Sequence, residues 1–168
     1  GDADLKKTNV KSGEKIMNEN SYKMINVIVN HGYAEDAMNA ARKAGAIVMV
    51  DEVQTGIGRT GTLLASSTFD IDAEVVTLAK GIAGGVPMGV CLFKGKANKV
   101  FVAGDHQSTF AGNPLACAAG CVVLDTVSDK NFLDEVVKKG EYIRNTIKSW
   151  EIPFVKEVRG KGLMIGIQ

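Results

Sequence analysis

Cysteine and histidine are scarce in this chain, with three and two copies among 168 residues. The odd cysteine count, without the paired spacing of a disulfide framework, indicates reduced thiols and a cytoplasmic protein. Cys117 and Cys121 are one helical turn apart with few other metal ligands nearby, so we expect core packing and no metal site.

Long apolar runs and an excess of one charge are also missing. No apolar stretch is long enough to cross a bilayer, and the first 20 residues lack the apolar core of a signal peptide. Twenty basic residues nearly balance 19 acidic ones, which argues against a nucleic-acid or anionic-membrane partner. With 45% apolar residues, the composition is that of an ordinary globular protein.

The order of the predicted elements indicates an α/β fold. Residues 25–29 resemble a strand, and residues 34–44 resemble a helix that ends at Gly45. Residues 46–50, 75–79 and 88–93 are apolar runs without alternation, which is typical of strands buried on both faces. The pattern therefore predicts a mostly parallel sheet with flanking helices.

The last third of the chain is predicted to be helical and then extended. Asn113 followed by Pro114 is typical of a helix start, and the helix to about Val127 is apolar almost all round, so it should be buried. A second, amphipathic helix should start near Ser128. Residues 152–158 and 163–167 resemble strands on either side of residues 159–162.

An acid and a lysine follow two of the predicted strands. Asp51 and Glu52 come directly after one apolar run, and Lys80 comes directly after another. Ligands bind at the carboxyl edge of open α/β sheets. From position alone, the acids could also be solvated loop residues or a helix N-cap, and Lys80 a surface lysine on a flexible loop. A partly desolvated lysine can form a Schiff base, and pyridoxal phosphate (PLP) needs a lysine for its aldehyde and an acid for its ring nitrogen.

Two further segments carry polar or glycine patterns. Residues 56–61 match the dinucleotide pattern G-x-G-x-x-G, but five residues separate them from the strand and two carboxylates would face a pyrophosphate, so a tight loop near a site is the better interpretation. Residues 106–113 place hydroxyls ahead of a helix N-terminus, which suits an anion such as a phosphate, or simple capping by Asn113.

Four motifs in consistent order resemble those of class III aminotransferases, closest to the acetylornithine and ornithine enzymes. They are VDEVQTGIGRTG at 50–61, LAKG at 78–81, STFAGNPLA at 108–116 and VRGKGL at 158–163. The resemblance runs from about Ala41 to Gln168 and implies the large α/β domain of fold type I PLP enzymes, the start of a small C-terminal domain, and a homodimer. Residues 1–30 show no match, and we expect a polar tail over 1–20, a partial large domain over 21–128 and the C-terminal part over 129–168.

The resemblance also implies roles for six residues. Lys80 is similar to the lysine that forms the aldimine and moves the proton, and Asp51 to the acid that keeps the pyridine nitrogen protonated. Val53 resembles the residue packed on the ring, and Gln54 the one near the ring hydroxyl. Thr109 resembles the threonine that reaches the phosphate of the neighbouring subunit's cofactor. Arg159 is similar to the arginine that holds the substrate carboxylate with two parallel bonds.

Transamination from acetylornithine or a related ω-amine to 2-oxoglutarate is the activity that this resemblance implies, with PLP as cofactor. The family's upstream phosphate loop is not recognisable in the chain, so we expect a truncated chain with weak PLP binding. An alternative from another class is a catalytically incompetent fragment that acts as a dimerisation or PLP-binding module. A nucleotide-binding module built on the glycines at 56–61 is a third, weaker alternative.

Overall fold

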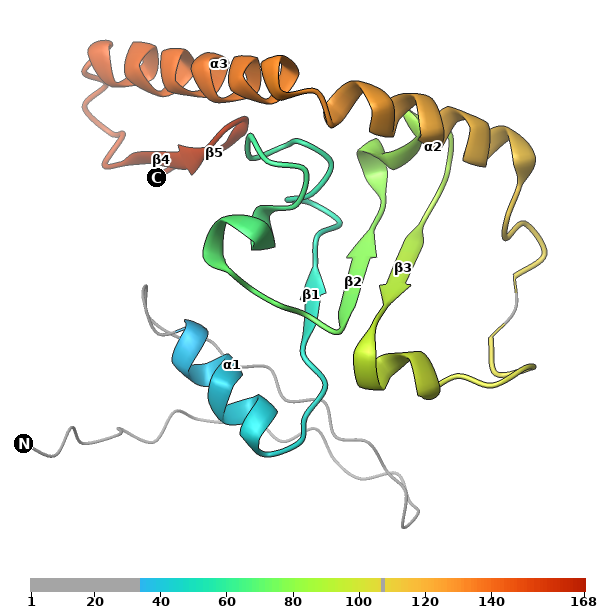
Figure 1. The fold of residues 1–168 in the computed structure, drawn as a ribbon. Coiled ribbons are helices and arrows are strands. Elements are labelled where there is room, and N and C mark those ends of the chain that lie inside the picture. Colours follow the sequence, from blue (N-terminus) through green and yellow to red (C-terminus); the bar gives the residue numbers. More distant parts are fainter. Residues whose placement is uncertain (1–33, 107) are drawn as a thin grey trace, which may run out of the picture.

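A three-stranded sheet forms the centre of the molecule (Figure 1). The computed structural model describes residues 34–106 and 108–168, so the strand predicted at 25–29 lies outside the described residues. The helices are α1 (Ala34–Lys43), α2 (Pro114–Val127) and α3 (Lys130–Ser149). The strands are β1 (Met49–Asp51), β2 (Val75–Leu78), β3 (Val90–Phe93), β4 (Val158–Lys161) and β5 (Met164–Ile167), and short 3-10 helices are η1 (Ala65–Phe69), η2 (Lys80–Ala83) and η3 (Gly95–Lys99).

The sheet has the order β1-β2-β3, with one parallel and one antiparallel pairing. β1 and β2 run parallel in the register Met49↔Val75 to Asp51↔Thr77, as the sequence predicted. β3 runs antiparallel to β2, so the prediction of a mostly parallel sheet is wrong for this pair. The short η2 turn lets the chain reverse direction beside β2, whereas a parallel neighbour needs a longer crossover.

The core lies on one face of β2 and the lysine loop that follows it. Leu78, Ile82 and Ala83 are buried there, with partly buried apolar side chains from β3 and α2 packed around them. α2 crosses η2 with Gly120 facing the Met88 side chain and the Ile82 carbonyl. In Figure 1 this places α2 over the carboxyl end of β2.

Four predictions of burial are wrong. Leu92 in β3 is 48% exposed, although residues 88–93 were expected to be buried on both faces. Met49 in β1 is 56% exposed, although residues 46–50 were expected to be buried on both faces. α2 buries Ala116, Gly120 and Val127, while Leu115 and Val122 are 70% and 66% exposed. Cys121 on the same helix is exposed as well, against the prediction of core packing. α2 is apolar on most faces, but the described residues cover only the face that contains Ala116, Gly120 and Val127.

The C-terminal part consists of α3 and an antiparallel hairpin beneath it (Figure 1). α3 begins at Lys130, two residues later than predicted, with Asp129 as its N-cap. The predicted strand at 152–158 is wrong: β4 is Val158–Lys161, which places Arg159 inside a strand. Pro153 interrupts the upstream apolar run, and proline cannot donate a ladder hydrogen bond.

The N-terminus of α2 gives a first testable prediction. The Asn113 side-chain oxygen accepts hydrogen bonds from the amides of Leu115 and Ala116 at 3.0 and 3.2 Å. Asn113→Ala should therefore lower the free energy of unfolding by about 1 kcal/mol, measured by urea denaturation. Asn145→Ala, an exposed mid-helix change on α3, is the control and should be near neutral or slightly stabilising. A loss no larger than that of the control would contradict the capping role.

None of the helices described for residues 34–168 combines the length and the apolar character that a membrane span requires.

Candidate active site

The acid and the lysine singled out in the sequence meet at one edge of the sheet. β1 and β2 are parallel and paired Asp51↔Thr77, so both strands end on the same side. Asp51 is the last residue of β1, and Lys80 follows β2 by two residues, at the start of η2. The carboxyl ends of neighbouring parallel strands are where open α/β sheets bind ligands.

Lys80 has an unusual backbone conformation. Its φ angle is +52°, in the left-handed region that L-residues other than glycine seldom adopt. Such conformations carry a strain of about 1–3 kcal/mol and cluster at functional sites. The residue is exposed, and its amine donates a hydrogen bond to Oε1 of Gln54. The described residues therefore do not desolvate this amine as the sequence predicted.

The Asp51 carboxylate is held in place by two hydrogen bonds. Its Oδ1 atom accepts from the Val53 amide at 2.9 Å and from the Thr77 hydroxyl at 3.1 Å. The first bond is local and the second crosses to β2, so the side chain is fixed relative to both strands. Asp51 is exposed and can receive a cationic ligand group at this edge. Val53, which the resemblance predicts to pack on the cofactor ring, lies two residues after Asp51 and is half-buried.

Glu52 points to the opposite side and is 1% exposed. Its Oε1 accepts from the Ser66 amide at 2.6 Å, and its Oε2 accepts from the Thr55 hydroxyl. Burial alone would raise the pKa of this carboxyl, but the hydrogen bonds from Thr55 and Ser66 outweigh it and hold the pKa below its usual 4.5. The sequence shows Glu52 only as a neighbour of Asp51, because its partner Ser66 lies 14 residues away.

The depressed pKa of Glu52 predicts a stability that depends on pH. A carboxyl whose pKa is lower in the folded state adds stability above its unfolded pKa of about 4.5, and this is lost as pH falls through the folded pKa. Glu52→Gln should unfold at lower urea than the native chain at pH 7, and the gap should shrink below pH 4.5. The exposed Glu141→Gln is the control. A gap that stays constant from pH 7 to pH 3 would contradict the assignment.

The glycine loop at 56–61 packs against the C-terminal part rather than around a phosphate. A Cβ on Gly61 would lie 2.4 Å from a Val137 methyl group on α3, and one on Gly58 would touch Leu133. Ile57 in this loop has φ +54° and lies against Gly81, directly under the lysine loop. The interpretation as a tight loop near the site fits this packing better than dinucleotide binding.

Thr109 and Arg159 are not joined to Lys80 by the contacts of the described residues. Thr109 lies in the exposed segment that runs outward from the sheet before α2 (Figure 1). Asn113 caps the helix that follows, as one of the two interpretations of residues 106–113 expected. Arg159 donates to Glu157 and to Gln168 at 2.6 and 3.0 Å and is exposed, so its guanidinium is available on the hairpin.

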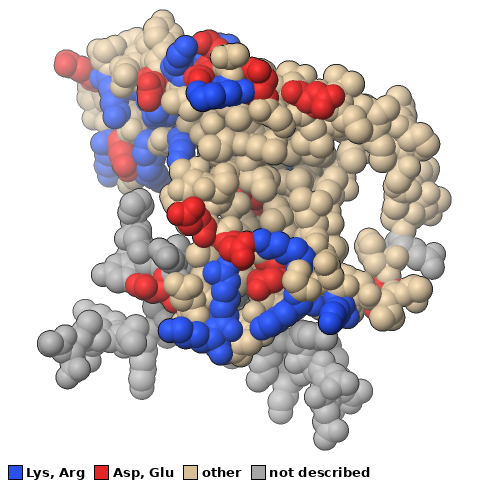
Figure 2. Space-filling view, viewed as in Figure 1, with Lys and Arg blue, Asp and Glu red and all other residues tan. Residues whose placement is uncertain are grey.

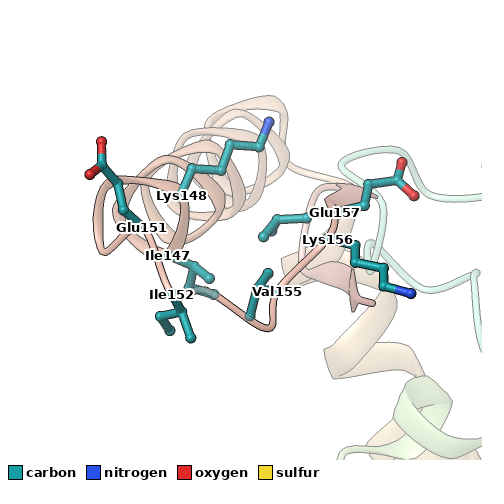
Figure 3. Close-up of a pocket in the computed structure, with 8 residues that line it drawn as sticks. Ile147, Lys148, Glu151, Ile152, Val155, Lys156 and Glu157 are labelled. Carbon is teal, nitrogen blue, oxygen red and sulfur yellow. The ribbon is translucent and has the colours of Figure 1, made fainter.

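A shallow hollow of about 360 Å³ lies elsewhere, between the end of α3 and the segment before β4 (Figure 3). Ile147, Ile152 and Val155 form its floor, and the charged ends of Lys148, Glu151 and Lys156 point away from it. The hollow contains none of the predicted site residues. We found no group of three or more potential metal ligands among the residues that the structure describes.

Solved structures identify this α/β arrangement as the fold of PLP-dependent aminotransferases. Ornithine aminotransferase from Toxoplasma gondii has a TM-score of 0.76 at 32% identity, over 83% of this chain and 34% of that one. Acetylornithine aminotransferase from Elizabethkingia anophelis has a TM-score of 0.75 at 35% identity, over 82% and 35%.

The sequence comparisons then give the family. The model described as aminotransferase class-III matches residues 25–168, and the chain belongs to this family. Acetylornithine aminotransferase from Streptomyces coelicolor is 41% identical over 155 residues, which is 92% of this chain and 38% of the relative. Acetylornithine aminotransferase 1 from Bordetella pertussis is 48% identical over 127 residues, 74% of this chain and 32% of the relative. The chain thus spans about two fifths or less of these relatives.

The comparisons correct one sequence-based prediction. The family match begins at residue 25, and the Streptomyces relative aligns with 92% of the chain, so the likeness extends into the first 30 residues. Class III aminotransferases are PLP-dependent enzymes, so the cofactor predicted from Lys80 and Asp51 is that of the family.

Proposed function

We propose that the protein transfers an amino group from acetylornithine or a related ω-amine to 2-oxoglutarate, with PLP as cofactor. The observation that carries the proposal is that Asp51 and Lys80 end up at the same carboxyl edge of the paired strands β1 and β2, where Lys80 donates a hydrogen bond to Gln54. The acetylornithine and ornithine aminotransferases among its relatives favour this donor class. The alternative of an incompetent fragment finds no support in these comparisons.

The residues present fit the cofactor. PLP supplies an aldehyde that condenses with amines and a ring that withdraws electrons when its nitrogen is protonated. The exposed Nζ of Lys80 would bind the aldehyde carbon and, once a donor amine displaces it, carry a proton between donor and cofactor carbons. The Asp51 carboxylate, fixed by Thr77, would keep the ring nitrogen protonated. Gln54 would contact the ring hydroxyl, and Val53 the ring face.

Two other residues complete the proposal from outside this cluster. Arg159 would hold the substrate carboxylate, because its planar fork matches two carboxylate oxygens. Thr109 would reach the phosphate bound by a neighbouring subunit, which requires a homodimer. We place this homodimer in the cytoplasm. A large apolar surface supports such a dimer: Phe110, Leu115 and Val122 are 80%, 70% and 66% exposed. Figure 2 shows almost no charge over α2, while charged side chains gather over α3 and near α1.

Borohydride reduction tests the proposal. The purified chain would be incubated with PLP, reduced and digested, and the pyridoxyl group located by mass spectrometry. We expect the label on Lys80, and glutamate formation from N-acetylornithine and 2-oxoglutarate. Labelling spread over surface lysines such as Lys94 and Lys96 would contradict the proposed site.

A further inference from the structure

Glu52 is the largest fully buried side chain among the described residues, and the proposed chemistry does not use it. Glu52 nevertheless lies between two residues of the proposed site. Asp51 precedes it at the sheet edge, and Gln54, two residues later, accepts a hydrogen bond from Lys80. A buried carboxylate between two site residues calls for a physical reason, because burying a charge is unfavourable unless hydrogen bonds compensate for it.

The hydrogen bonds of Glu52 tie three segments together. Its backbone amide donates to the Thr77 carbonyl of β2 at 2.9 Å, and its backbone carbonyl accepts from the Gly56 amide at 2.9 Å. Its side chain accepts from the Thr55 hydroxyl and, at 2.6 Å, from the Ser66 amide in η1. Leu64, the residue before η1, has no side-chain oxygen to cap that helix, so Glu52 satisfies the amide from outside.

These bonds close the turn that contains Gln54. Residues 52 and 56 are joined through the backbone, and residues 52 and 55 through their side chains. Gly56 is required at the end of the turn, since a Cβ there would lie 2.8 Å from the Glu52 carbonyl oxygen. Gln54 lies between the fixed residues and is itself exposed, so the turn and the hydrogen bond from Lys80 set the direction of its amide.

We propose that Glu52 is a positioning residue that holds the Gln54 amide against Lys80 by anchoring the 52–56 turn to η1. The catalytic consequence of this inference rests on the proposed function. The positioning itself rests only on the hydrogen bonds of Glu52, Gln54 and Lys80. Without the anchor, Gln54 samples other directions, and Lys80 loses its hydrogen-bond acceptor. The Lys80 amine then becomes more reactive in the chain without PLP.

Trace labelling with acetic anhydride at pH 8 measures this reactivity. The rate at Lys80 is divided by the rate at the exposed Lys96 in the same sample, both read by mass spectrometry. A net hydrogen bond corresponds to about a twofold to tenfold change in such a ratio, so Glu52→Gln should raise it by that factor. Gln54→Ala should raise it equally, and Glu52→Gln in the Gln54→Ala background should add nothing.

Two further variants keep the test sharp. Glu74→Gln is the matched control, because the Glu74 carboxylate also accepts from a backbone amide beside β1, that of Val48 at 2.9 Å, but does not touch the turn. Its ratio should not change. Thr55→Val removes the hydrogen bond from Thr55 to Glu52 and should also raise the ratio. This variant tests the inference independently in case Glu52→Gln does not fold.

An unchanged ratio in both Glu52→Gln and Thr55→Val, or additive effects of Glu52→Gln and Gln54→Ala, would overturn the inference. The proposed function fails separately: if PLP and borohydride do not label Lys80 while the ratios follow the pattern above, the positioning role stands and the transaminase assignment falls.

Discussion

Lys80→Ala is expected to abolish the borohydride-fixed pyridoxyl label and to lower transamination by about 100- to 10,000-fold, the usual contribution of a positioned general acid–base. The reason is that Nζ of Lys80 has two proposed tasks, holding the cofactor aldehyde and moving the proton. Alanine can do neither, and the neighbouring Gln54 amide is not nucleophilic. Rates of glutamate formation and the mass of the reduced chain measure the two tasks separately.

The fold should survive this change. Lys80 is exposed, and its left-handed backbone is stabilised by the η2 turn and the buried Ile82 and Ala83 rather than by its side chain. Lys96→Ala, another exposed lysine, is the control and should keep both label and rate. A Lys80→Ala chain that still takes up one pyridoxyl group at a defined lysine would disprove the assignment of the site.

Gly140→Ala is expected to destabilise the chain by about 3 kcal/mol, near the upper end for an overpacked core position. A Cβ on Gly140 would lie 1.9 Å from the carbonyl oxygen and 2.4 Å from the carbonyl carbon of Gly162. Both atoms are backbone, and the hairpin turn that contains them is held by an Arg144 hydrogen bond to the same oxygen at 3.0 Å. The turn therefore cannot yield as a side chain would. Urea denaturation measures the loss.

Gly120→Ala is the matched control for this prediction. Both glycines are buried within helices, so alanine improves helix propensity by about 1 kcal/mol at either position. At Gly120 the nearest atom would be the Met88 sulfur at 3.3 Å, part of a flexible side chain. Gly120→Ala should therefore be near neutral or stabilising. Equal destabilisation by the two changes would mean that the contact with Gly162 is not responsible.

The parts of the site that follow from local pattern could be predicted from the sequence. Asp51 and Lys80 each follow an apolar run, and parallel pairing brings such ends together. Asn113 and Pro114 define a helix start by their own chemistry. The role of Glu52 could not be predicted, because Ser66 comes into reach only when η1 folds back on the turn.

The errors concern burial and strand register. A run such as residues 46–50 shows that a segment is apolar, but the cover on each face comes from distant parts of the chain. Arg159 lies in β4 because pairing with Gly166 selects that register over the upstream run. Pairing depends on two segments at once, and a single segment does not encode it.

The contact among Gly140, Gly162 and the glycine loop has a thermodynamic consequence. The Leu163 amide donates to the Arg59 carbonyl at 2.9 Å, so the hairpin with Arg159 is in direct contact with the loop that continues from Gln54. If a ligand at Arg159 and a ligand at Gln54 favour the same arrangement of this contact, each ligand raises the affinity for the other. Linkage then requires that a carboxylate at Arg159 tighten cofactor binding by the same factor by which the cofactor tightens carboxylate binding.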